Sequence, residues 1–164
     1  MFQQGEFVMY GDSGLCLVEK VGEPDFSMSE RGKQYYFLRV QADGGRIYVP
    51  TDTRMPLRPP ITRQEAEALL TSLGDLPVAQ PDSRDHKVIL QFYQSLLRPH
   101  TSRAVAQTVK SMRFRHAGPG RMNSAEEALL KRAENQLCGE LACALEISPE
   151  DARNRLSAAL AGQQ

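Results

Sequence analysis

Cysteine is scarce in this sequence, and its few copies stand in no arrangement typical of a metal or disulfide site. The chain contains three cysteines, Cys16, Cys138 and Cys143, an odd number with no C-x-x-C pair. Zinc ligation and a disulfide scaffold are therefore not expected. Buried, reduced thiols in a cytoplasmic protein are the interpretation that we favour.

Long apolar runs are absent as well. None approaches the length that a helix needs to cross a bilayer, and the first ten residues, MFQQGEFVMY, contain no basic leader followed by an apolar stretch. We therefore expect neither a membrane partner nor a secretory signal. With 41% apolar and 24% charged residues among 164, the composition is that of a globular protein. The length suits one ordinary domain or two small ones.

The sequence also lacks the residue patterns of catalysis. His86, His100 and His116 have no Cys, Ser or paired carboxylate at the spacing of a known motif. The glycines form neither G-x-G-x-x-G nor a phosphate-binding loop, and no H-E-x-x-H is present. We therefore expect no enzymatic activity and no cofactor, which leaves a binding module.

Positive charge, by contrast, is concentrated in the middle of the chain, although the formal net charge is zero. Residues 83–121 contain a single acid, Asp85, while the segments before and after them are net acidic. Such a block suggests an anionic partner, because guanidinium and ammonium groups bind phosphates well. A basic, solvated helical face is the alternative, and charge alone leaves both interpretations open. The bases of the block are Arg84, Lys87, Arg98, Arg103, Lys110, Arg113, Arg115 and Arg121.

Short runs rich in Val, Leu, Tyr and Phe occupy the first 58 residues. They are residues 6–10, 14–22, 33–41 and 45–50, and Gly-containing or polar segments separate them. The pattern predicts β-strands joined by turns, and strands this short are expected to curl into an SH3-like or Tudor-like barrel. The prolines that follow are expected to break any further regular ladder; they are Pro50, Pro56, Pro59 and Pro60.

Five helices are predicted after residue 60. Their expected ranges are 63–73, 84–97, 103–115, 125–146 and 149–161, with a flexible connector before the fourth. Residues with short polar side chains stand where each helix begins, as helix N-caps require. The expected caps are Thr62 with Glu65 in a capping box, Asp82 or Ser83, Thr101 or Ser102, Asn123 or Ser124, and Ser148 followed by Pro149.

The predicted fold class is therefore α+β, a small N-terminal SH3/Tudor-like β-barrel followed by an all-α C-terminal domain of about five helices. The strand RIYVP alternates so that Arg46 and Tyr48 share one face, and both residue types are enriched at protein interfaces. In the longest helix the expected apolar seam consists of Leu130, Leu137, Leu141 and Leu145.

Three motifs in order carry a resemblance to a known family. MFQQGEFVMYGDSGLCLVEKVGE is similar to G-[DE]-x-V-x-Y followed by a V-E-x-[IV] strand. GKQYYFLRV and RIYVPTDTRMPLRPPIT are similar to K-x-Y-Y-x-L and [IV]-x-V-P…LRP-[VI]-[ST], and LLKRAENQLCGELACALEISPEDARNRL resembles a long helix with its closing helix. The chain thus resembles, over nearly its full length, the CarD/CdnL family of bacterial RNA polymerase-binding transcription regulators.

The resemblance implies a Tudor-like domain, residues 1–59, that binds the β subunit of RNA polymerase. It also implies a helical domain, residues 60–164, that contacts promoter DNA at the upstream edge of the transcription bubble and modulates open-complex stability. The family's polymerase-contact position falls on Tyr48, so Arg46 and Tyr48 are the expected polymerase-binding residues. DNA contacts are expected to be mostly to the backbone, with specificity supplied by tethering to the polymerase.

One departure from the family concerns DNA. The family carries a tryptophan at the start of the second helix of its C-terminal domain, whereas this sequence has none, and His86 is expected at that position. Glu126 and Glu127 stand where the family has basic residues. A protein–protein adaptor on RNA polymerase that has lost productive DNA binding is therefore the alternative function. The expected DNA-binding residues are His86, Lys87, Lys110, Arg113, Arg115 and Arg121.

Overall fold

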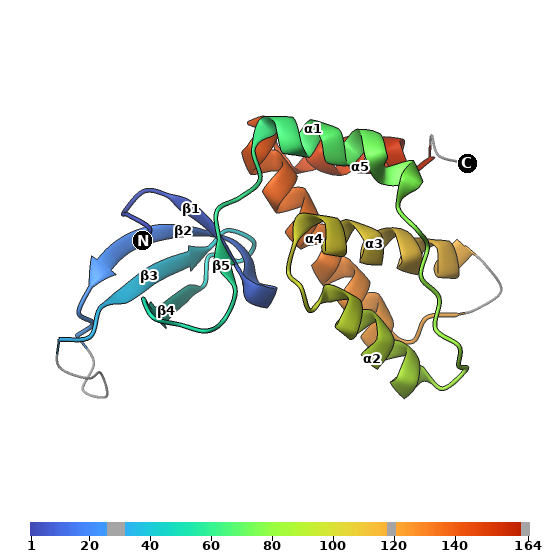
Figure 1. Cartoon of the computed structure of the whole chain (residues 1–164), viewed down its shortest axis with the longest axis horizontal. Coiled ribbons are helices and arrows are strands. Elements are labelled where there is room, and N and C mark those ends of the chain that lie inside the picture. The colour runs from blue at the N-terminus through green and yellow to red at the C-terminus, as the bar shows by residue number, and fades with distance from the viewer. Residues whose placement is uncertain (26–31, 118–120, 162–164) are drawn as a thin grey trace. The chain divides into compact units, whose positions relative to one another are not determined.

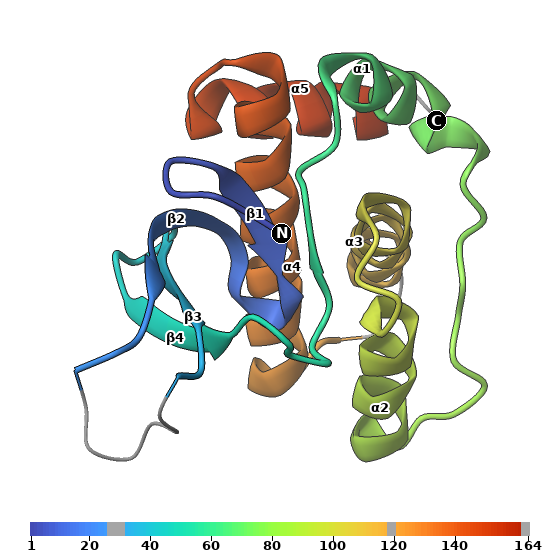
Figure 2. The ribbon, with the colours of Figure 1, turned by 60° about the vertical axis from the view of Figure 1, so that its left-hand side comes forward.

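The computed structural model describes residues 1–25, 32–117 and 121–161. It divides into two compact units, Met1–Pro60 and Ile61–Gln164. The first contains five strands and the second five α-helices (Figures 1 and 2). The predicted α+β class, with strands followed by helices, is confirmed.

The strands of the first unit form an antiparallel half-barrel in the order β4-β3-β2-β1-β5. The expectation that the prolines break any further ladder was wrong for Leu57 and Arg58, which pair with Tyr10 and Met9 of β1. These two residues lie between Pro56 and Pro59, and unlike proline they keep their N–H groups. The strands are β1 (Phe7–Tyr10), β2 (Gly14–Gly22), β3 (Tyr35–Val40), β4 (Arg46–Pro50) and β5 (Leu57–Arg58).

Side chains alternate between the two faces of this sheet. In β3, Tyr36, Leu38 and Val40 are buried, while the residues between them are half-buried. A register irregularity between Val18 and Lys20 in β2 interrupts the alternation there, and bulges of this kind bend a strand. The buried face forms the small core of the half-barrel.

The helices begin where short polar side chains accept backbone hydrogen bonds. The capping box is confirmed, since Thr62 accepts from Glu65 and Glu65 accepts from the N–H of Thr62. The second helix is capped by Asp85, not by Asp82 or Ser83, because its carboxylate accepts from the N–H of Lys87. The helices are α1 (Arg63–Ser72), α2 (His86–Leu97), α3 (Ser102–Ala117), α4 (Ser124–Leu145) and α5 (Pro149–Ala161), with a 3-10 turn η2 (Leu73–Asp75) after α1.

Two details of the helices differ from expectation. Helix α3 continues through His116 and Ala117, which were expected to belong to the connector; residues 118–120 lie outside the described residues. In α4 the apolar seam begins at Leu129, which is 5% exposed, whereas Leu130 only packs at the margin of the core. The remaining seam residues, Leu137, Leu141 and Leu145, are buried as predicted.

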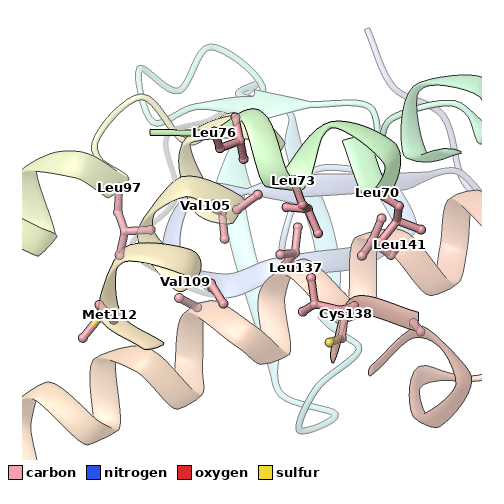
Figure 3. Close-up of a cluster of buried hydrophobic side chains, with 14 of the residues drawn as sticks. Leu70, Leu73, Leu76, Leu97, Val105, Val109, Met112, Leu137, Cys138 and Leu141 are labelled. Carbon is pink, nitrogen blue, oxygen red and sulfur yellow. The ribbon is translucent and has the colours of Figure 1, made fainter. Parts of the chain in front are cut away.

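The core of the helical unit lies where α1, α3 and α5 pack on α4, with η2 against α3 and α5 and with α2 against α3. Figure 3 shows Leu73 and Leu76 of the η2 region facing Val105 of α3, with Leu137 and Leu141 of α4 alongside. Leucines deliver much apolar area to such a core, and each fully buried leucine stabilises the fold by about 2 kcal/mol. Within the described residues, no helix is long and apolar enough to cross a bilayer.

Two of the cysteines, Cys16 and Cys138, are buried, and Cys143 is half-buried. Burial raises the pKa of the Cys16 thiol to about 11, with a smaller contribution from the charge of Asp43. Because the thiolate is the reactive form, this thiol is unreactive near neutral pH.

Candidate interaction surfaces

The two predicted polymerase-binding residues lie side by side on one face of the half-barrel. Arg46 and Tyr48 alternate with the less exposed Ile47 and Val49 in β4, and the Tyr48 side chain is 47% exposed. Strand β4 stands at one end of the sheet order. The alternation predicted from RIYVP is therefore what places both residues on the solvent side.

Residues of β2 and β3 extend this surface. Phe37 lies directly opposite Tyr48, and their rings meet edge to face with centroids 5.0 Å apart. The Lys20 ammonium lies 5.2 Å from the centroid of the Phe37 ring, within the range of a cation–π contact. We call this surface the strand face; it consists of Glu19, Lys20, Phe37, Arg39, Arg46 and Tyr48.

Glu19 holds the two arginines of the strand face. Arg39 and Arg46 are directly opposed across β3 and β4, a placement in which like charges repel. Glu19 accepts from Arg39 Nε at 3.1 Å and lies 3.6 Å from Arg46 Nε. One carboxylate therefore relieves the repulsion and keeps both guanidinium groups on the surface. The sequence alone did not identify Glu19, Lys20, Phe37 and Arg39 as part of this surface; the register of β3 against β2 and β4 identifies them.

In the helical unit, three of the six predicted DNA-binding residues are exposed. His86 and Lys87 are the first two residues of α2, and Arg121 precedes α4. No acid occurs between Asp85 and Arg121 in the sequence. These exposed donors reach phosphates without any rearrangement of the fold.

Lys110 and Arg113 are engaged within the helical unit. The Lys110 ammonium donates to the carbonyl oxygens of Leu73, Gly74 and Leu76 at 2.7, 2.9 and 2.8 Å, which uses all three of its N–H donors. Arg113 Nε donates to Glu134 Oε1 at 2.9 Å. Both side chains therefore link α3 to another element of the unit. Both are half-buried, whereas Lys87 is exposed.

The remaining predicted residue, Arg115, belongs to a partly buried group of polar side chains. Its Nε lies 4.0 Å from Oε2 of Glu126, whose side chain is fully buried. Oε1 of the same carboxylate contacts His86 Nδ1 at 2.5 Å. Burial raises the pKa of the Tyr93 phenol, on which the charges of Arg115 and Glu126 also act. We call these four residues, His86, Tyr93, Arg115 and Glu126, the helix-end cluster.

The structure thus brings His86 and Arg115 together at Glu126, leaves Lys87 and Arg121 exposed, and assigns Lys110 and Arg113 to other contacts. Glu126 was identified from the sequence only as an acid unfavourable to DNA binding. A buried carboxylate cannot be recognised from sequence spacing, because His86 and Arg115 reach it from two other helices. Over residues 1–25, 32–117 and 121–161, no three His, Cys, Asp or Glu side chains are grouped to hold a metal ion.

Residues 2–61 match the CarD-like/TRCF RID domain family. The half-barrel is therefore a CarD-like RNA polymerase-interacting domain, and CarD-like proteins are non-enzymatic regulators that bind RNA polymerase. The match ends within the first residues of the helical unit, so the likeness of the helices to the same family stays a prediction. No curated protein matches the chain.

Proposed function

We propose that this chain, whose residues 2–61 form a CarD-like RNA polymerase-interacting domain, is a transcription regulator that binds the polymerase β subunit through the strand face. Its helical unit binds promoter DNA near the upstream edge of the transcription bubble and modulates the stability of the open complex. The polymerase-interacting domain is the observation that carries the proposal.

The strand face has the chemistry of a protein-binding surface. It presents tyrosine and arginine side chains, which dominate the binding energy of many interfaces, and the Phe37–Tyr48 ring pair gives it apolar area. Strand β4 ends the sheet, and a strand in this position can pair with an extended segment of a partner. In this arrangement, the backbone of a β-subunit segment pairs with the backbone of β4. Side chains of the β subunit contact Arg46 and Tyr48.

The exposed cations of the helical unit support the DNA half of the proposal. Three of them stand at the starts of helices: His86 and Lys87 begin α2, and Arg121 precedes α4. Arg115 is partly exposed, and both it and His86 contact Glu126. None of these residues is part of a helix with base-reading side chains in register, so contacts to phosphates are expected. Binding to the polymerase would supply the promoter specificity by raising the local concentration.

A second function, an adaptor that binds the polymerase without binding DNA, is favoured by one observation. Lys110 and Arg113 are committed to contacts inside the helical unit, and the exposed Glu127 lies in the first turn of α4. Fewer cations are then available to phosphates than the sequence suggests.

The first test measures binding of the full-length chain to purified β subunit, with Arg46→Glu as the variant and Arg98→Glu as its control. Arg98 is an exposed arginine of the helical unit, so both variants make the same charge change. We expect Arg46→Glu to weaken binding at least about tenfold and Arg98→Glu to leave it unchanged. Equal binding by both variants would refute the strand face as the polymerase contact.

The second test separates the regulator from the adaptor by measuring DNA affinity against salt concentration. Each phosphate contact that is lost reduces the slope of log affinity against log salt by about 1. The double variant Lys87→Ala/Arg121→Ala is expected to reduce it by about 2. If the wild-type protein binds no DNA at low salt, the adaptor is the correct function.

A further inference from the structure

Glu126 is the most deeply buried charged side chain of the helical unit, and it contacts two of the predicted DNA-binding residues, His86 and Arg115. Its side chain has no exposure to solvent, whereas its neighbour Glu127 is exposed. A buried carboxylate is costly unless it is paired and hydrogen-bonded. The cost of burying the Glu126 carboxylate must therefore be offset by charged or hydrogen-bonding partners.

The partners come from two other helices. His86 is the first residue of α2, Arg115 lies in the last turn of α3, and Glu126 lies in the first turn of α4. The backbone N–H of Glu126 donates to the side chain of Asn123, which caps α4. The carboxylate is thus fixed at the start of its own helix and contacts the ends of the two others.

The two carboxylate oxygens differ in their contacts, because Oε1 is hydrogen-bonded to His86, whereas Oε2 and Arg115 Nε are buried without a hydrogen-bond partner among the described residues and interact only by charge. Oε1 contacts His86 Nδ1 and Oε2 lies 4.0 Å from Arg115 Nε. Because an ionised carboxylate only accepts hydrogen bonds, the His86 contact places the ring proton on Nδ1. It leaves Nε2 as the ring nitrogen that Glu126 does not engage. The His86 side chain is 51% exposed and the Arg115 side chain 21% exposed.

We infer that Glu126 is a positioning residue, which holds His86 and Arg115 in one arrangement for contact with DNA phosphates. The inference rests on the DNA half of the proposed function. Glu126 presents no charge of its own at the surface, so it does not oppose DNA binding as an exposed acid would. It holds His86 by a hydrogen bond and attracts the Arg115 guanidinium by its charge, and this lowers the entropy that the two side chains lose when they bind a phosphate.

Two variants that make the same charge change test the inference. Glu126→Gln and Glu127→Gln each remove one negative charge, and each is examined as the full-length protein by fluorescence anisotropy with a promoter DNA duplex at low salt. If only net charge mattered, both would strengthen binding. In Glu126→Gln, however, an amide NH₂ replaces one oxygen and faces a donor. We expect Glu126→Gln to weaken DNA binding at least about threefold and Glu127→Gln to strengthen it by less than that.

A third variant separates positioning from loss of stability. Leu156→Ala removes a buried side chain of α5 and destabilises the unit without changing the helix-end cluster. Below its unfolding temperature it is expected to bind DNA as the wild type does. Equal strengthening by Glu126→Gln and Glu127→Gln would overturn the inference and leave the proposed function intact. Absence of DNA binding by the wild type would overturn both.

A spectroscopic measurement on the wild-type protein decides the point even if Glu126→Gln does not fold. Long-range ¹H–¹⁵N correlation spectra report which imidazole nitrogen carries the proton. We expect His86 to be protonated at Nδ1, and at neutral pH to differ in this respect from the exposed His116 of α3. A neutral His86 with its proton on Nε2 alone would refute the positioning by Glu126.

Discussion

Replacing Lys110 by methionine is expected to destabilise the helical unit and to leave its DNA affinity unchanged. The Lys110 ammonium donates to three carbonyl oxygens, at 2.7, 2.9 and 2.8 Å, all between Leu73 and Leu76. It thereby fixes the η2 turn against α3, where Leu73 and Leu76 enter the core (Figure 3). Methionine retains most of the apolar stem and lacks the donors.

The magnitude follows from these three contacts. A hydrogen bond to a charged group contributes about 1.5–3 kcal/mol, but the three share one ammonium and the carbonyl oxygens can be partly rehydrated. A net loss of about 2–4 kcal/mol is therefore expected. For a unit of this size, the loss corresponds to a decrease in Tm of roughly 10–20 °C.

The assay is urea unfolding of the full-length protein, followed by far-UV circular dichroism, with Lys131→Met as control. Lys131 is an exposed lysine of α4, and its replacement is expected to change the free energy of unfolding by less than about 0.5 kcal/mol. DNA affinity against salt is measured on the same variants. A Lys110→Met protein of wild-type stability, whose salt slope falls by about 1, would refute this reasoning and restore Lys110 as a phosphate contact.

Three further predictions concern stability and titration. Thr62→Ala removes the cap of α1 and is expected to cost about 1 kcal/mol of unfolding free energy, whereas Thr62→Ser should retain most of it in the same urea assay. Because burial raises the pKa of Cys16 from 9.0 to about 11, the folded state favours the thiol. As pH rises between those two values, the free energy of unfolding of the wild type is therefore expected to fall by up to about 2 kcal/mol relative to that of Cys16→Ala. A difference in unfolding free energy that stays constant with pH would contradict this. The hydrogen bond from Arg155 lowers the pKa of Glu67, so the pair stabilises the fold above the ordinary carboxyl pKa and less as pH falls. In Arg155→Gln the Glu67 pKa, followed by NMR, should rise, and an unchanged value would show that Arg155 is not its cause.

Local patterns in the sequence were sufficient for the fold class and for most of its elements. Alternation within RIYVP placed Arg46 and Tyr48 on the exposed face, and Thr62 with Glu65 marked the start of α1. Such features depend on residues close together in the chain, so sequence reveals them. The short β5 escaped because its pairing is with β1, far away in the sequence, and two residues carry too little pattern.

The charged residues of the helical unit were the part that sequence could not assign. A block of basic residues is visible in the sequence, but Lys110, Arg113 and Arg115 have the same side-chain chemistry whether they face water or a partner inside the protein. Each of their partners belongs to another element of the unit: Leu73 for Lys110, Glu134 for Arg113 and Glu126 for Arg115.

The burial of the acidic residue Glu126 could not be predicted from the sequence either. The sequence identifies it as an acid beside Glu127 in the first turn of a helix, and nothing local distinguishes the two. Contacts with His86 of α2 and Arg115 of α3 accompany the burial of Glu126, whereas Glu127 is exposed. The sequence by itself predicted a small N-terminal β-barrel followed by about five helices with a basic block among them. Only the tertiary structure decided which charges reach the surface, because burial and pairing depend on contacts between helices that are distant in the chain.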